Sequence, residues 1–200
     1  TSTACNTAAT SAGARLTATR SETASLRAHL RRGGLIAYPT ESCYGLGCDP
    51  RNPRALKRLI QLKGRSAAKG MLLIADHFRR LRPFVRPLNS ADRARVEQTW
   101  PGPVTWVVPA SAACLPDLTG GRPTIAVRVT AHPGAARQCR GLGMALVSTS
   151  ANKSGHKPAR TAAECRGIFG ARMHVIDGRI GPRRRPSTLI DLATGTVLRP

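Results

Sequence analysis

The sequence has few acidic residues, few aromatic residues and a large excess of positive charge. Its 200 residues contain 10 Asp and Glu against 32 Lys and Arg, which gives a formal net charge of +22 at pH 7. Such an excess opposes compaction through self-repulsion and favours polyanionic ligands such as nucleotides, RNA or acidic protein surfaces. Charge alone does not separate these ligands, and a basic surface inherited from an Arg-rich proteome is an equally simple explanation.

Long apolar runs are also absent. No run reaches the roughly 20 residues that span a bilayer, and the N-terminal residues lack the apolar segment of a signal peptide. We therefore expect no membrane contact and a cytoplasmic protein with reduced thiols. The six cysteines form no CxxC pair and have no histidine cluster beside them at zinc-ligand spacing, so we expect no structural zinc site.

Several motifs of nucleotide-binding and catalytic folds are missing. The chain has no GxGxxG fingerprint, no GxxxxGK[ST] P-loop and no GxSxG elbow. These absences argue against Rossmann-type dinucleotide binding, Walker-type ATP binding and serine catalysis of the α/β-hydrolase kind. No repeat period stands out, which excludes a solenoid.

The chain divides into a tail and one domain. Residues 1–20 are rich in Thr, Ser and Ala without hydrophobic periodicity, which is typical of a flexible tail. Residues 21–200 suffice for a single domain with one core. Periodicity and turn residues predict helices near 21–32, 53–63, 89–99 and 161–169, and strands near 35–38, 71–75, 104–108, 124–129, 144–148, 174–176, 189–192 and 196–198. Because strands outnumber helices, we expect an α/β fold with a mixed twisted sheet and packed helices.

Two segments place polar or basic side chains where an element ends. In LIAYPTESCYGLGCD a strand ends at Pro39 and is followed by polar side chains and two glycines, although an ordinary strand-to-loop junction has the same pattern. The second segment carries Lys63, Arg65 and Lys69, an arrangement that suits a triphosphate. A solvated helix end in a highly basic chain would look similar.

Two further segments carry polar residues on strands. The apolar strand beginning at Ala145 ends in Ser148, Thr149, Ser150 and Asn152, which could grip a phosphate or cap the next element. Arg128 stands within an otherwise apolar strand and needs an anionic partner. Because acidic residues are scarce, a ligand anion is favoured over a structural carboxylate.

Five segments in order and spacing carry a family resemblance: YPTESCYGLGCD, LKGRSAAKG, WPGPVTWVVP, IAVRVTAHP and LVSTSANKSG. Together they resemble the YrdC and TsaC family of threonylcarbamoyl-AMP synthases, over about residues 21–200 and in its short form. The family's KxR and SxN signature is matched by Lys63 with Arg65 and by Ser150 with Asn152. The resemblance implies a YrdC-like open α/β fold in which a twisted mixed sheet and packed helices enclose a basic cavity.

The resemblance also implies a nucleotidyltransferase that converts ATP, L-threonine and bicarbonate to L-threonylcarbamoyladenylate and pyrophosphate. The product would pass to tRNA threonylcarbamoyl-transfer proteins. By similarity the catalytic residues are Lys63, Arg65, Ser150 and Asn152. Residues near ATP are Lys63, Arg65, Thr124, Ser148, Asn152 and Pro158. Residues near threonine are Thr40, Lys69, Arg128, Ser150 and Ser187. Mg²⁺ is expected with the triphosphate, without a dedicated cage of acidic residues.

Two other readings compete with the synthase. A non-catalytic YrdC-like module could bind RNA through its basic face, as the net charge favours. A relative of hydrogenase maturation proteins is disfavoured because their zinc-finger and acylphosphatase segments are missing. Intact KxR and SxN positions favour the synthase, and we expect salt-sensitive RNA binding in addition to catalysis, through exposed cations at Arg79, Arg80, Arg82, Arg86 and residues 183–185.

Overall fold

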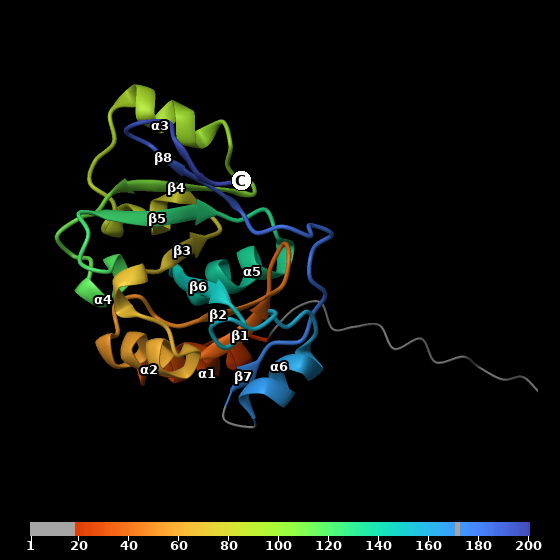
Figure 1. Ribbon diagram of the computed structural model, residues 1–200. Helices are drawn as coiled ribbons and strands as arrows, with labels where there is room; N and C mark the ends of the chain where they lie inside the picture. Colours follow the sequence, from red (N-terminus) through yellow and green to blue (C-terminus); the bar gives the residue numbers. More distant parts are fainter. Residues whose placement is uncertain (1–18, 171–172) are drawn as a thin grey trace, which may run out of the picture.

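The computed structural model describes residues 19–170 and 173–200. Within these ranges the strands form one mixed sheet in the order β7-β1-β2-β6-β3-β5-β4-β8-β9 (Figure 1). Parallel pairs are β1 with β7, β3 with β5 and β4 with β8, and the other neighbours are antiparallel. The strands are β1 (Ile36–Pro39), β2 (Tyr44–Gly47), β3 (Leu72–Ala75), β4 (Val104–Pro109), β5 (Thr124–Val129), β6 (Leu146–Ser150), β7 (His174–Val175), β8 (Thr188–Asp191) and β9 (Val197–Arg199).

Helices cover the sheet from both faces. They are α1 (Arg20–Arg31), α2 (Pro53–Lys63), α3 (Ser90–Glu97), α4 (Pro116–Thr119), α5 (Pro133–Leu142) and α6 (Ala162–Phe169), with the short 3₁₀ helices η1 (Ala67–Lys69), η2 (Phe78–Arg80) and η3 (Arg82–Phe84). In the described part of the chain, no helix has the length and apolar character to cross a membrane. The tail expected over residues 1–20 lies outside the described residues, except for Thr19, which caps α1, and Arg20, its first residue.

Helix α2 shows how local sequence positions a functional side chain. The side chain of Asn52 caps the helix by accepting a hydrogen bond from the Ala55 amide, and Pro53 supplies a fixed φ at the first position. Leu56 and Leu59 are buried against the sheet, and Gly64 ends the helix at φ 58°. Lys63 therefore stands at the last position of a firmly docked helix.

The two faces of the sheet differ in how completely helices cover them. One face packs its apolar side chains against Leu59 of α2, Val96 of α3, Leu118 of α4 and Cys165 of α6. On the other face, a smaller core joins α1 and α5 to the strands around Ile74 of β3. The rest of this second face has no helix on it in the described structure, and the cavity described below lies there.

The elements expected from sequence did not include β2, α4, α5 or the three 3₁₀ helices. β2 was expected to be a loop because it contains Gly45 and Gly47. The glycines are needed for packing, since a Cβ on Gly47 would lie 2.7 Å from the ring of Tyr38. No helix was expected between residues 99 and 161, but the His132 ring accepts a hydrogen bond from the Ala135 amide and caps α5, which starts at Pro133.

Candidate functional site

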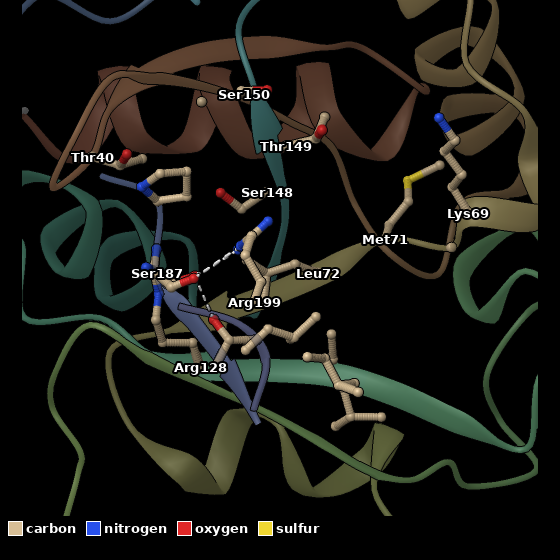
Figure 2. A pocket seen from close by; sticks show the side chains of 18 of the residues that line it. Thr40, Lys69, Met71, Leu72, Arg128, Ser148, Thr149, Ser150, Ser187 and Arg199 are labelled. Carbon is tan, nitrogen blue, oxygen red and sulfur yellow. Dashed lines mark hydrogen bonds between the residues drawn. The ribbon is translucent and has the colours of Figure 1, made fainter. Parts of the chain in front are cut away.

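A cavity of about 780 Å³ opens on the uncovered part of the second face. Register places Leu72 of β3, Ser148 of β6 and Ala126 of β5 side by side on this face, because paired residues of neighbouring strands point the same way. All three line the cavity. Figure 2 shows Ser148, Thr149 and Ser150 in succession along β6 beside the cavity.

One end of the cavity is lined by small hydroxyl groups. Thr40, Ser148, Ser187 and Thr105 are all buried and contribute to the lining. The hydroxyls of Thr105 and Ser187 lie 2.8 Å apart, and the Thr40 hydroxyl donates to the carbonyl of Cys43 at 2.7 Å. Three of these four residues were expected from sequence, and this end can hydrogen-bond a small polar ligand.

Arg128 brings a buried positive charge to the hydroxyl-lined end. Its side chain is 7% exposed, and its Nη2 donates to Oε2 of Glu41 at 3.1 Å. Thr130 donates to the other carboxylate oxygen of Glu41 at 2.7 Å, so the carboxylate is fixed on both sides. The sequence argument favoured a ligand as the partner of Arg128, whereas the structure supplies Glu41 from the turn after β1. The Nε of Arg128 is buried without a partner among the described residues.

Lys63 holds the turn that follows β6. Its side chain is buried, and its ammonium donates to the carbonyls of Ser150 and Asn152 and to the Asn152 side-chain oxygen, the last two at 2.9 and 3.1 Å. Burial, together with the nearby charge of Arg65, lowers the pKa of Lys63 to about 8. The KxR and SxN motifs thus form one network. Lys63 and Asn152 do not line the described cavity. Lys63 is buried behind Ser150, which does line it, and Asn152 lies in the half-buried turn that follows.

Arg65 lies at the guanidinium-rich end of the cavity. Its Nη2 donates to the carbonyl of Gly70 at 2.9 Å and its Nη1 to the hydroxyl of Thr149 at 3.4 Å, while its Nε is buried without a described partner. Burial lowers the pKa of Arg65, and the charges of Arg122 and Arg199 lower it further. Guanidiniums gathered in this way provide a site for an anion.

The sequence analysis missed several cavity residues. Arg199 donates from Nη2 to the carbonyl of Ser187 at 2.8 Å. It also donates to the Ser187 hydroxyl at 3.3 Å, a contact drawn as a dashed line in Figure 2. Its pKa is lowered by burial and by Arg128. Arg199 reaches the site because β9 pairs with β8. No local sequence pattern around Arg199 predicts that it lies at the cavity. Other lining residues missed in this way are Thr105, Arg122, Arg160 and Arg184.

The remaining expected residues are on the cavity wall but do not all group as anticipated. Thr124, Pro158 and Ser150 line the cavity. Lys69 also lines it, but Figure 2 shows Lys69 far from Thr40 and Ser187, at the other end of the labelled group. Its position therefore associates Lys69 with Arg65 rather than with the hydroxyl-lined end.

Cysteines and metal ligands add little to the site. Cys43 lines the cavity, and burial raises the pKa of its thiol. The five cysteines of the described ranges are all free. Residues 19–170 and 173–200 contain no cluster of three or more His, Cys, Asp or Glu that could hold a metal ion.

Residues 28–200 match the Sua5/YciO/YrdC family, whose description is telomere recombination. The chain is 74% identical over 174 residues to the threonylcarbamoyl-AMP synthase of Thiobacillus denitrificans, covering 87% of this chain and 93% of that one. It is 54% identical over 175 residues to the synthase of the same name from Methylobacillus flagellatus, covering 88% and 97%.

A solved structure agrees with these sequence relatives. P. abyssi Sua5 complexed with L-threonine matches with a TM-score of 0.80 and 30% identity over 88% of this chain. The match spans 52% of the P. abyssi chain, so the present chain corresponds to about half of that protein. The resemblance seen in the motifs and the mixed-sheet fold are both confirmed, and the chain belongs to the Sua5/YciO/YrdC family.

Proposed function

We propose that this protein is a threonylcarbamoyl-AMP synthase that converts L-threonine, bicarbonate and ATP to L-threonylcarbamoyladenylate and pyrophosphate. The observation that carries the proposal is that one cavity joins a hydroxyl-lined end, with the buried Arg128, to a basic end with Arg65 and Lys69, while Arg199 contacts Ser187 between them. Relatives that share 74% and 54% identity with this chain bear the name of this enzyme.

The hydroxyl-lined end suits L-threonine. The Arg128 guanidinium, fixed by Glu41, can pair with the amino-acid carboxylate, because a carboxylate matches the planar guanidinium fork. The hydroxyls of Thr40 and Ser187 can hydrogen-bond the side-chain hydroxyl and the amine. Gly45 keeps this end open, since a Cβ there would lie 3.1 Å from the methyl carbon of Thr40 and 3.3 Å from the Ser148 hydroxyl.

The guanidinium-rich end suits the phosphates of ATP. The threonine amine and bicarbonate give a carbamate and water, and a carbamate oxygen then attacks the α-phosphorus while pyrophosphate leaves. Negative charge accumulates on the leaving group, and preorganised cations stabilise it more effectively than a general base would. Arg65 and Lys69, with Arg122 and Arg199 beside them, supply this charge.

Magnesium would enter with the nucleotide. Asp191 is the acidic residue on the described cavity wall, and its Oδ1 already accepts hydrogen bonds from the amides of Ala193 and Thr194. The residues present therefore do not form a protein cage for Mg²⁺, which prefers octahedral oxygen ligands. An ion coordinated by the phosphates themselves would neutralise part of their charge.

The adenylate would pass to tRNA threonylcarbamoyl-transfer proteins in the cytoplasm.

The alternative function is that of an RNA-binding module that catalyses no reaction. Against it, the cavity buries two guanidinium Nε atoms, of Arg65 and Arg128, without a partner in the described chain, an arrangement that is costly until an anion satisfies the same groups.

The substrate assignment is tested by pyrophosphate release. We expect release to require ATP, L-threonine and bicarbonate together, so that omitting any one of them abolishes it. Serine serves as the control, since it keeps the hydroxyl but lacks the methyl group, and we expect it to react more slowly. Equal turnover with serine, or no turnover with threonine, would contradict the assignment.

The pH dependence should report the charge of Lys63. Its pKa of about 8 lies below the ordinary value of 10.5, so the cost of burying the ammonium is present in full below about pH 8 and disappears as pH rises from about 8 to 10.5. Above about pH 8 the neutral amine holds the 150–152 turn less strongly, and kcat/KM for ATP should fall. Lys63→Arg should lack this decline, because a guanidinium stays charged. A wild-type profile that stays flat to pH 9.5 would contradict the role of Lys63.

A further inference from the structure

The loop between α2 and β3 carries Lys69 to the cavity with little packing of its own. Residues 66–69 are all exposed, and the 3₁₀ helix η1 within this loop buries none of its side chains. Lys69 lines the cavity at the end far from Thr40 (Figure 2). Segments with few buried contacts open readily. The position of Lys69 therefore depends on what holds the backbone of residues 66–70, which we call the Lys69 loop.

Glycines let the Lys69 loop lie directly against the end of α4. A Cβ on Gly120 would lie 2.5 Å from the carbonyl oxygen of Ala68, and a Cβ on Gly70 would lie 2.8 Å from that of Thr119. Both glycines also have positive φ, 67° at Gly120 and 59° at Gly70, a conformation that other residues rarely adopt. The backbones of the two segments therefore meet with no room for a side chain between them.

Two arginines hold the carbonyl groups of the Lys69 loop. Arg65, which directly precedes the loop, donates from Nη2 to the carbonyls of Lys69 and Gly70 at 3.3 and 2.9 Å. Arg122 donates from Nη1 to the carbonyl of Ala68 at 2.7 Å. Arg65 belongs to the same stretch of chain as the loop, whereas Arg122 lies just before β5, 54 positions away from Ala68. In the described chain, Arg122 is thus the side chain that ties the loop to a distant segment.

We propose that Arg122 is a positioning residue of the synthase, which holds the Lys69 loop against the end of α4 and so keeps the Lys69 ammonium at the cavity. The Nη2 of Arg122 lies over Gly70, since a Cβ there would meet it at 2.6 Å. Both terminal nitrogens of the guanidinium therefore lie at the loop backbone. A lysine ammonium on its flexible stem supplies preorganised charge only where its backbone is fixed. This inference rests on the proposed function and deepens it.

Hydrogen exchange of the full chain, measured without substrates, tests the structural half of the proposal. In Arg122→Ala the amides of residues 65–71 should exchange about fivefold faster, because the loop loses a hydrogen bond to a charged donor. The carbonyl of Ala68 is open to water, so the melting temperature should fall by no more than about 3 °C. The control is Arg137→Ala, which removes an exposed arginine of α5 that does not line the cavity and should leave the exchange of residues 65–71 unchanged.

Pyrophosphate release tests whether the loop serves catalysis through Lys69. Arg122→Ala should lower kcat about tenfold, since a small displacement of a catalytic group can cost up to about a hundredfold. In a Lys69→Met background the same substitution should lower kcat by about twofold at most, because the group that Arg122 positions is already gone.

A second variant disturbs the same contact from the side of α4. Gly120→Ala would place its Cβ against the carbonyl of Ala68, so it should reproduce both the faster exchange and the lower kcat. If Gly120→Ala unfolds, Arg122→Ala decides the question by itself.

The contrary results are distinct. Unchanged exchange of residues 65–71 in Arg122→Ala would mean that the loop does not depend on this arginine. An equal loss of kcat in the wild-type and Lys69→Met backgrounds would mean that Arg122 contacts the substrates directly. Faster exchange in Arg137→Ala as well would reduce the effect to overall charge. If the wild type released no pyrophosphate from threonine, bicarbonate and ATP, the proposed function would fail, while the exchange comparison would still decide whether Arg122 holds the loop.

Discussion

Arg65→Ala should slow pyrophosphate release by about a hundredfold or more, the size of effect seen when one preorganised donor to a developing anion is removed. Arg65 lines the guanidinium-rich end and is held by the carbonyls of Lys69 and Gly70 and the hydroxyl of Thr149. Its charge faces the cavity from a fixed position, so it needs no reorganisation during the reaction. The loss should appear mainly in kcat, measured at saturating ATP, threonine and bicarbonate.

Two companion variants make the result specific. Arg65→Lys keeps the charge but loses the planar fork, and we expect it to recover only a part of the rate. Arg54→Ala removes an exposed arginine of α2, the helix that precedes Arg65. Arg54 does not line the cavity, so this variant should leave turnover unchanged. Wild-type turnover in Arg65→Ala at an unchanged melting temperature would move the chemistry to another part of the molecule.

Lys63→Met should separate activity from stability. Holding the buried ammonium charged at neutral pH costs roughly 3 kcal/mol, given its pKa of about 8, and methionine removes that cost. The oxygens that lose their donor belong to exposed Ser150 and half-buried Asn152, where water can replace it. The melting temperature should therefore stay within a few degrees of wild type. Turnover should fall about a hundredfold because the turn after β6 loses its anchor.

The mode of action of Lys63 can be distinguished from a direct phosphate contact. Because Lys63 lies behind the described cavity wall, its loss should reduce kcat more than it raises the KM for ATP. The decline of kcat/KM above about pH 8 should also vanish in Lys63→Met. A large rise in the KM for ATP with an unchanged kcat would instead mean that the ammonium contacts the nucleotide in the ground state.

The local sequence was sufficient to predict the bounds of elements that are enclosed by capping and turn residues or marked by β-branched runs. The bounds of α2 were predicted to the residue, because a capping Asn, a first-turn Pro and a terminal Gly enclose an apolar stripe. The strand β5 was also placed correctly by its β-branched and apolar residues. β2 was missed because its cause is tertiary. Gly45 and Gly47 are dictated by the side chains of neighbouring strands, and no periodic pattern in one segment records that contact. α5 was missed although its signals are local, namely the capping His132, the first-position Pro133 and the terminal Gly143.

The residues of the site that belong to sequence motifs could be predicted, whereas their contacts and the residues outside the motifs could not. Thr40, Ser148 and Ser187 line one cavity although they are far apart in sequence. The resemblance assigned Ser148 to ATP and the other two to threonine, and that division of roles stays a prediction. The role of Lys63 as an anchor could not be read from the chain, since its partners are carbonyl groups that every residue has. The position of Arg199 at the cavity follows from the pairing of β9 with β8, which the sequence alone does not reveal.

The central position of strand β6 determines when the sheet and the cavity are completed during folding. In the described sheet it joins β2, an early strand, to β3, and no other strand connects the two sides. Until residues 146–150 insert between them, each side can form its own ladder without the other. Because β6 also carries Ser148 and Ser150, the cavity is complete only when this long-range pairing has formed. Enzymatic turnover recovered during refolding would therefore time the closure of the sheet, later than any signal from helix formation.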